Sequence, residues 1–236
     1  MEKAAVVGNA KGKVEEILKK EGFVIDEMAP QVVFSVGGDG TFMIAEAQYP
    51  GVPKIFIKHS WDCKKCRHNF KPIIKLFKEG KYKIVELFKL EAKINGQEQK
   101  ALIAFNDINI HYSPPTALRF TLSINDKKHT NIAIGDGAVI STPYGSTGYY
   151  HSITRKAFKK GIGIAFNNLR EPVKNCVVKS DSVITINIQR GPGKVFADSI
   201  RKILDIKDGD VITIRKAIGK AFIIKLEGHD LKVVNY

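Results

Sequence analysis

The first 80 residues alternate between apolar runs of strand length and amphipathic stretches of helix length, and this order constrains the fold more than any other feature. Apolar runs that predict strands lie at residues 3–9, 23–28, 31–36 and 53–59. Patterns that predict helices lie at residues 12–22, 41–48 and 70–80. Strands that alternate with helices form a parallel sheet with the helices on its faces. We therefore expect a Rossmann-like α/β domain at the N-terminus.

The pattern changes near residue 82, where strand-like runs begin to follow one another. The first two runs, residues 83–94 and 100–112, flank Asn95-Gly96, a dipeptide typical of tight hairpins. Further strand-like runs lie at residues 118–124, 176–188, 193–198, 210–216 and 221–227, and a single helical pattern lies at 146–161. We expect an α/β domain over residues 1–90 and a mostly β domain over residues 91–236, whose last residues can return to the first domain.

Composition excludes several classes of protein. The hydrophobic fraction of 44% supports a sizeable core and excludes a disordered chain. No apolar run reaches the roughly 18 residues that span a bilayer, and the N-terminal residues lack the pattern of a signal peptide. Three cysteines, an odd number, do not form the disulfide framework of a secreted protein. We expect a cytoplasmic protein with no membrane partner.

The charge balance favours an anionic partner. A formal net charge of +14 suits a nucleotide, a polyphosphate or a nucleic acid. A lysine-rich solvated surface is the alternative explanation, because the lysine pairs are scattered along the chain. Nucleic acid is not the expected partner, since the chain has no basic arm and no basic pattern interleaved with aromatic residues.

Residues 35–42 read SVGGDGTF and place three glycines between a predicted strand and a predicted helix. Such a loop lets backbone N–H groups approach phosphate oxygens, and the helix N-terminus adds a partial positive charge. The spacing is neither that of a dinucleotide-binding fingerprint nor that of a Walker A loop. A carboxylate repels phosphate, so the presence of Asp39 in this loop calls for a function. It can help to hold Mg²⁺, or it can accept a proton from an attacking hydroxyl. Both roles indicate phosphoryl transfer to an alcohol, and the alternative is that Asp39 only caps the helix.

Residues 135–152 read GDGAVISTPYGSTGYYHS and are dense in hydroxyl groups and glycines. Hydroxyls can bind ribose and phosphate, glycines can permit close approach of a ligand, and tyrosines can stack on a base. A Ser/Thr-rich helix cap explains only two or three of these residues. Upstream, Asn106-Asp107 forms a polar pair inside a strand-like run, which indicates a bulge, an edge or a pair that faces a ligand.

The segments GGDGT, FND, GDG and STPYGSTGY, in this order and spacing, resemble the NAD kinase family. The GGDG motif is shared with diacylglycerol kinases, sphingosine kinases and phosphofructokinases, so residues 135–152 carry most of the specificity. The resemblance extends over roughly residues 32–200. It implies phosphoryl transfer from ATP or polyphosphate to the 2′-hydroxyl of the adenosine ribose of NAD, with a divalent metal such as Mg²⁺. It also implies a β-sandwich-like second domain and a homodimer or homotetramer.

The resemblance assigns roles to individual residues. Asp39 would be the general base. The loop that faces the phosphates of ATP would contain Gly37, Gly38, Gly40 and Thr41. NAD would contact Asp39, Gly40, Asn106, Asp107, Asp136, Thr147, Tyr149, Ser152 and Ala165. Of these, Asp136 would contact the substrate of its own or a neighbouring subunit.

Three segments depart from the family pattern. Asp198 is followed by Ser199 where the family has Asp-Gly, and Tyr144 lies in a turn that usually reads Thr-Pro-Thr-Gly. KHSWDCKKCRHNF replaces an Asn-Gly-rich loop. Two alternatives therefore stay open. One is a kinase of the same superfamily that acts on another nucleoside, sugar or lipid hydroxyl, and the other is a non-catalytic nucleotide-binding protein.

The same divergent loop contains potential zinc ligands within ten residues, namely His59, Cys63, Cys66 and His68. Their spacing is not that of a common zinc finger. A reversible disulfide and free thiols are the alternatives. The basic residues of this loop, Lys64, Lys65 and Arg67, offer a further hypothesis, which is contact with the phosphates of ATP.

Overall fold

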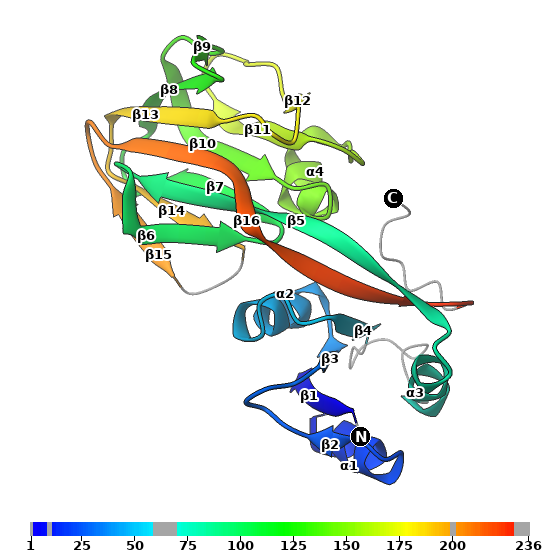
Figure 1. Ribbon diagram of the computed structural model, residues 1–236. Coiled ribbons are helices and arrows are strands. Elements are labelled where there is room, and N and C mark those ends of the chain that lie inside the picture. The colour runs from blue at the N-terminus through cyan, green and yellow to red at the C-terminus, as the bar shows by residue number, and fades with distance from the viewer. Residues whose placement is uncertain (1, 9–10, 59–69, 199–201, 229–236) are drawn as a thin grey trace. The chain divides into compact units, whose positions relative to one another are not determined.

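The structure is a computed structural model and describes residues 2–8, 11–58, 70–198 and 202–228. It divides into two compact units, Met1–Leu87 with Gly219–Tyr236, and Phe88–Ile218. Two long strands, β5 (Tyr82–Ile94) and β16 (Val211–Leu226), pair with each other and contribute residues to both units (Figure 1). The expected domain boundary at residue 90 falls inside β5. Among the helices of the described residues, none combines the length and hydropathy that a bilayer span requires.

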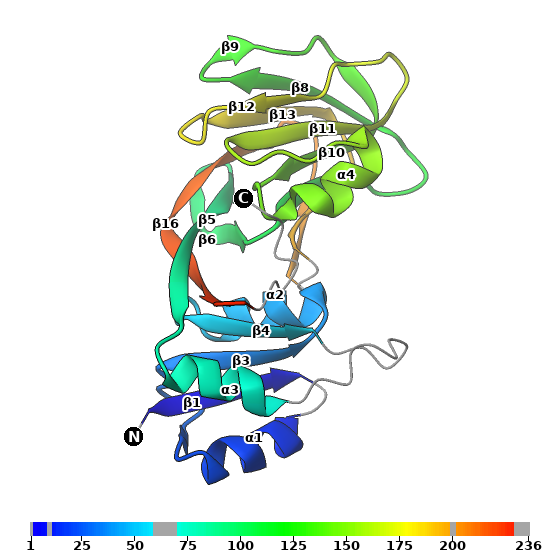
Figure 2. The same ribbon diagram turned by 90° about the vertical axis from the view of Figure 1, so that its right-hand side faces the viewer.

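The first unit is a parallel sheet with helices on both faces, in the strand order β16–β4–β3–β1–β2. Alternate residues of each strand point to opposite faces. One face packs on α1 and α3 through residues such as Leu18, Phe34 and Ile74 (Figure 2). The other face packs on α2 through Val33 and Ala45. The elements are β1 (Lys3–Gly8), α1 (Lys11–Lys20), β2 (Val24–Ile25), β3 (Val32–Gly37), α2 (Asp39–Gln48), β4 (Lys54–Lys58) and α3 (Phe70–Lys78).

The second unit consists mainly of antiparallel strands around a core that includes Leu90, Phe120 and Ile140. The strand order is β15–β14–β7–β10–β8–β13–β16, and β11 pairs with β10 and β12. Helix α4 (Tyr149–Thr154) packs on β10 and β11 (Figure 2). The remaining strands are β6 (Gln97–Ala104), β7 (Asp107–Tyr112), β8 (Leu118–Ile124), β9 (Lys127–Lys128), β10 (Ala133–Ser141), β11 (Ile162–Leu169), β12 (Cys176–Val178), β13 (Ile184–Arg190), β14 (Gly193–Ala197) and β15 (Ile203–Ile206).

Strand β10 was not expected from the sequence, because its glycines are typical of a loop. Along its length β10 changes neighbour, since Ala133–Gly135 pair with β8 and Gly137–Ser141 pair with β7. Gly137 has a φ of +139°, and an added Cβ would collide with the carbonyl oxygen of Ile110. A side chain cannot be accommodated at this position. At Gly137, therefore, the close approach that the glycine permits is to the protein's own backbone and not to a ligand.

The helix expected over residues 146–161 is shorter in the structure. A 3₁₀ turn at Gly145–Thr147 precedes α4, which ends at Thr154. Arg155 adopts a left-handed conformation (φ +56°), and its backbone N–H donates to the carbonyl oxygen of His151. A left-handed residue closes a helix, so the apolar and basic residues that follow do not extend it.

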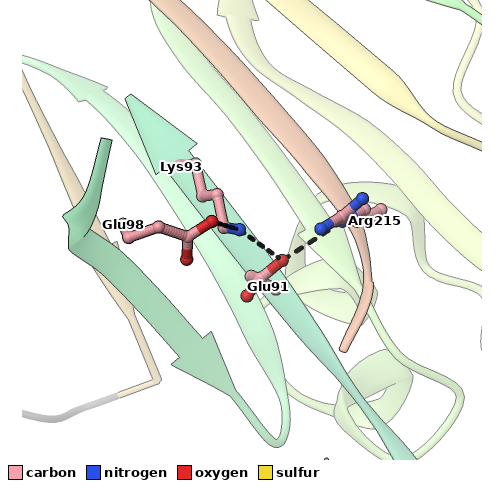
Figure 3. A network of polar contacts seen from close by, with 4 residues as sticks. All are labelled: Glu91, Lys93, Glu98 and Arg215. Carbon is pink, nitrogen blue, oxygen red and sulfur yellow. Dashed lines mark hydrogen bonds and ion pairs between the residues drawn. The ribbon is translucent and has the colours of Figure 1, made fainter. Parts of the chain in front are cut away.

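A network of charged side chains joins the β5–β6 hairpin to β16 (Figure 3). Glu91 accepts a hydrogen bond from Arg215 Nε at 3.1 Å and lies 3.5 Å from Lys93 Nζ. Lys93 also pairs with Glu98. The side chains of Glu91 and Lys93 are only 17% and 15% exposed, but those of Arg215 and Glu98 are 51% and 73% exposed, so water and salt screen the interactions with these outer partners.

We expect Glu91→Gln to lower the melting temperature by less than about 4 °C, because partly exposed ion pairs contribute little to stability. The difference from the wild type should shrink further at about 1 M salt. Thermal unfolding followed by circular dichroism at low and high salt tests this expectation. A salt-independent loss of about 10 °C or more would contradict it.

Candidate functional site

The glycine loop of the first unit connects β3 to α2. Gly37 ends β3, and Gly38 is the N-cap of α2 in an extended conformation (φ −95°, ψ −171°). Asp39 and Gly40 are the first residues of the helix, and both are exposed. The first N–H groups of a helix have no acceptor within the helix and carry a partial positive charge. The loop therefore offers exposed donors that suit phosphate oxygens.

Asp39 lies inside the first turn of α2 and is not its cap, because Gly38 occupies the N-cap position. The helix dipole favours a carboxylate in this turn. Since capping does not require Asp39, its exposed carboxylate remains accessible to a cation or to a hydroxyl proton. Thr41 follows in the same turn and is half-buried.

The opposite end of α2 is held by a buried ion pair. Lys54 Nζ lies 2.6 Å from Glu46 Oε2 and donates to the carbonyl oxygens of Tyr49 and Val52. The side chains of Lys54 and Glu46 are 0% and 4% exposed. The last turn of α2 contains no basic residue, so Lys54 supplies the cation that the helix C-terminus favours. The pair fixes the helix that carries Asp39.

In the second unit, the FND segment lies at a break between two strands. Strand β6 ends at Ala104 and β7 begins at Asp107, so the expected single strand over residues 100–112 is divided. The backbone N–H groups of Phe105, Asn106 and Asp107 donate to the carboxylate of Asp198 at 2.8, 2.7 and 3.1 Å. Asp198 is buried and left-handed (φ +52°). Its carboxylate organises the segment that contains the predicted NAD contacts Asn106 and Asp107.

The hydroxyl-rich turn also bonds to the FND segment. The backbone N–H of Thr142 donates to the carbonyl oxygen of Asn106, and Thr142 Oγ1 donates to that of Phe105, both at 2.8 Å. Gly145 donates to Thr142 Oγ1 at 3.1 Å, and an added Cβ at Gly145 would collide with the backbone of Asn106. Ser146 Oγ donates to the carbonyl oxygen of Pro143. These hydroxyl groups therefore bond to the protein and shape the turn.

The structure places Thr147 and Ser152 on the surface, and Ala165 in the core. Thr147 ends the 3₁₀ turn, and Ser152 lies on α4 with its hydroxyl bonded to the carbonyl oxygen of Tyr149. Ala165 is fully buried in a cluster with Val139 and Tyr150. The side chains of Thr147 and Ser152 are thus accessible to a ligand, whereas the methyl group of Ala165 packs in the core.

Tyr149 and Asp136 are each bonded to an asparagine of β11. Asn167 Nδ2 donates to the Tyr149 hydroxyl at 2.8 Å, and Asn168 Nδ2 donates to Asp136 Oδ2 at 3.2 Å. Burial, with smaller effects from the charges of Asp136 and Asp107, raises the pKa of Tyr149. The phenol therefore stays protonated at neutral pH and can donate a hydrogen bond to a ligand.

Asp107 is a buried carboxyl group that titrates near neutral pH. Burial raises its pKa from the ordinary 3.8 to about 7, and the charge of Asp198 adds to the increase. A hydrogen bond from Asn109 Nδ2, 2.6 Å from Asp107 Oδ1, opposes the shift. Proton uptake at Asp107 thus competes with any ligand that needs the carboxylate form.

Sequence reasoning did not identify Asn109, Asn167 and Asn168. A signal for Asn109 was present, because Asp107, Asn109 and His111 alternate with isoleucines in DINIHY and so share one strand face. The roles of Asn167 and Asn168 depend on the pairing of β11 with β10, and β11 was not expected.

The potential zinc ligands His59, Cys63, Cys66 and His68 lie outside the described residues, as does Ser199. Within the ranges that the structure describes, no group of three or more His, Cys, Asp or Glu side chains is placed to hold a metal ion.

Comparison with known proteins gives consistent matches. Residues 105–226 match the family model of the ATP-NAD kinase C-terminal domain. A relative named NAD kinase from Sulfurisphaera tokodaii is 30% identical over 208 residues, which cover 84% of this chain and 78% of the relative. The NAD kinase of Saccharolobus solfataricus is 27% identical over 234 residues, covering 95% of this chain and 87% of the relative.

Solved structures share the fold. An NAD kinase from Archaeoglobus fulgidus in complex with ATP has a TM-score of 0.76 at 20% identity, covering 96% of this chain and 94% of that chain. The yeast NADH kinase complexed with NADH has a TM-score of 0.73 at 19% identity, covering 90% of this chain and 69% of that chain. These similarities confirm the expected α/β unit followed by a mostly β, sandwich-like unit.

Proposed function

Because this chain belongs to the NAD kinase family, we propose that it transfers a phosphoryl group from ATP to the 2′-hydroxyl of the adenosine ribose of NAD, which gives NADP. The match over residues 105–226 is the observation that carries this proposal, because it includes the FND, GDG and STPYG segments. The names of the relatives and of the two solved structures support NAD as acceptor and ATP as donor.

Phosphoryl transfer requires mainly positioning, neutralisation of charge and a group that handles the acceptor proton. The exposed N–H groups at the start of α2, with Gly37, Gly38, Gly40 and Thr41, bind the phosphates of the donor. Asp39 accepts the proton of the attacking 2′-hydroxyl. Its exposure supports this role, because an incoming hydroxyl can reach its carboxylate.

The second unit binds the dinucleotide. The ionised carboxylate of Asp107 and the amide of Asn106 hydrogen-bond hydroxyl groups of the ligand, and the Tyr149 phenol donates a further bond. Thr147 and Ser152 contribute exposed hydroxyl groups. Asp136 contacts the NAD of its own or of a neighbouring subunit, whereas Ala165, which the resemblance names as a further contact, is fully buried.

A divalent cation fits the donor loop. Mg²⁺ is usually held by one or two carboxylates together with substrate phosphates and water, and Asp39 supplies an exposed carboxylate beside the phosphate-binding N–H groups. When bound, the ion would neutralise charge on the phosphates. Polyphosphate as a second donor, a dimeric or tetrameric assembly, and a cytoplasmic location remain predictions from the sequence.

An acceptor panel tests the proposal. Purified protein with ATP and Mg²⁺ is offered NAD, NADH, adenosine, glycerol and diacylglycerol in separate reactions, and the panel is repeated with polyphosphate as donor. We expect NAD to be phosphorylated far faster than the three non-dinucleotide acceptors. Preferred phosphorylation of one of those three would favour the alternative kinase, and binding of NAD without transfer to any acceptor would favour a non-catalytic protein.

A further inference from the structure

Asn109 is a buried polar residue on an interior strand of the sheet. It lies on β7, opposite Val139 of β10 on one side and Phe196 of β14 on the other, and is 3% exposed. Its neighbours Ile108 and Ile110 point into the hydrophobic core, so Asn109 lies on the opposite face of the sheet, where its β10 partner Val139 is also buried. A buried amide in such surroundings is costly unless its polar atoms are hydrogen-bonded. The question is which interaction offsets this cost.

The amide of Asn109 has one partner in the part of the chain that the structure describes. Nδ2 donates to Asp107 Oδ1 at 2.6 Å, whereas the buried Oδ1 of Asn109 has no hydrogen-bond partner there. Because this oxygen is unpaired, the hydrogen bonding of the amide as a whole does not explain why an asparagine is buried here. Its donor, directed at a carboxylate, is the interaction that explains its presence.

The other groups around Asp107 do not favour its ionised form. Asp198, at the end of β14, brings a second negative charge, and the pKa of Asp107 is raised by that charge as well as by burial. Tyr149 on α4 is protonated at neutral pH. Ser141, the β10 partner of Asp107, is not titratable. Among the described groups that shift the pKa of Asp107, the hydrogen bond from Asn109 is the one that favours the carboxylate.

We propose that Asn109 is a positioning residue that holds the side chain of Asp107 in place and in its ionised form, ready to accept hydrogen bonds from the dinucleotide. This inference rests on the proposed function, because that function supplies the ligand of Asp107. Loss of the donor moves the titration of Asp107 to higher pH. NAD affinity then falls at neutral pH and recovers when the medium is alkaline enough to ionise Asp107.

Equilibrium binding of NAD measured by calorimetry between about pH 6 and about pH 9 tests the proposal. In the wild type the affinity should rise with pH around a midpoint near 7. In Asn109→Leu, which keeps the side-chain size but lacks the donor, the midpoint should move up by about one pH unit. Affinity should be about fivefold lower at pH 7, about tenfold lower near pH 6 and close to the wild type near pH 9. Asn109→Val provides the same test if leucine does not fit.

Asn187→Leu is the matched control, because Asn187 lies on β13 between β8 and β16 of the same unit. This variant should keep the wild-type midpoint. If Asn109→Leu weakens NAD binding equally at every pH, Asn109 has only a structural role and the proposal is overturned.

Carboxyl ¹³C NMR of the ligand-free protein separates this inference from the proposed function. The Asp107 resonance should titrate at higher pH in Asn109→Leu than in the wild type, whether or not the protein binds NAD. An unchanged titration would overturn the role of Asn109. Absence of NAD binding in the wild type, with the shift present, would overturn the proposed function and the assignment of the ligand.

Discussion

Asp39→Asn is expected to lower the turnover number for NADP formation by about 10²–10⁴-fold, the usual contribution of a positioned general base. The asparagine has nearly the same shape but cannot accept the proton of the 2′-hydroxyl at neutral pH. The fold should be retained, because Asp39 is exposed at the first turn of α2 and is not the residue that caps it. Steady-state kinetics with NAD and ATP, together with thermal unfolding, measure both effects.

Glu16→Gln is the matched control for Asp39→Asn. It makes the same change from carboxylate to amide at an exposed position of α1 in the same unit. Its turnover number and melting temperature should match those of the wild type. If Asp39→Asn retained near wild-type turnover, the base assignment would be abandoned. A higher KM for ATP with an unchanged turnover number would instead assign Asp39 to donor binding.

Asp198→Ala is expected to lower the free energy of unfolding by about 3 kcal/mol or more. The change leaves the N–H groups of Phe105, Asn106 and Asp107 without their acceptor, and an unpaired buried donor costs about 1–3 kcal/mol. Alanine is also disfavoured at the left-handed backbone of this position. For a chain of this size the melting temperature should fall by about 6 °C or more.

NAD affinity should fall as well, because Asp198 organises the segment that carries Asn106 and Asp107. Asp198→Asn gives a graded comparison. Its Oδ1 can still accept from Asn106 and Asp107, and asparagine tolerates the left-handed backbone, but its amide group cannot accept from Phe105. Its loss of stability should lie between those of the wild type and Asp198→Ala. Urea unfolding within about 1 kcal/mol of the wild type for Asp198→Ala would contradict the structural role of Asp198.

Local periodicity explains why the first unit was predictable from the sequence. Val14 and Leu18 mark the buried face of α1, and the apolar runs of β1 and β3 are buried throughout most of their length. The start of α2 after the glycine loop followed from the change in pattern at that point. Interactions within each segment determine these features, so a short window of sequence contains them.

The organisation of the second unit depends on contacts between distant segments. Asp198 accepts hydrogen bonds from N–H groups that lie 91 to 93 residues earlier in the chain, and no local sequence pattern indicates these contacts. Strand β10 was missed because Gly135 and Gly137 weaken a strand pattern, whereas their small size is needed where β10 changes neighbour. The same limit applies to the hydroxyl-rich turn. In the structure Thr142 is buried and shapes the turn, whereas Ser152 is exposed. The sequence alone does not distinguish these two roles.

The identity of the product tests the central claim most directly. Purified protein is incubated with NAD, ATP and Mg²⁺, and the product is examined by ³¹P NMR and with a dehydrogenase that accepts only NADP. We predict a new phosphate on the 2′-hydroxyl of the adenosine ribose and a product that the dehydrogenase reduces. A phosphate on any other hydroxyl, or NAD that stays unmodified although it binds, would contradict the account.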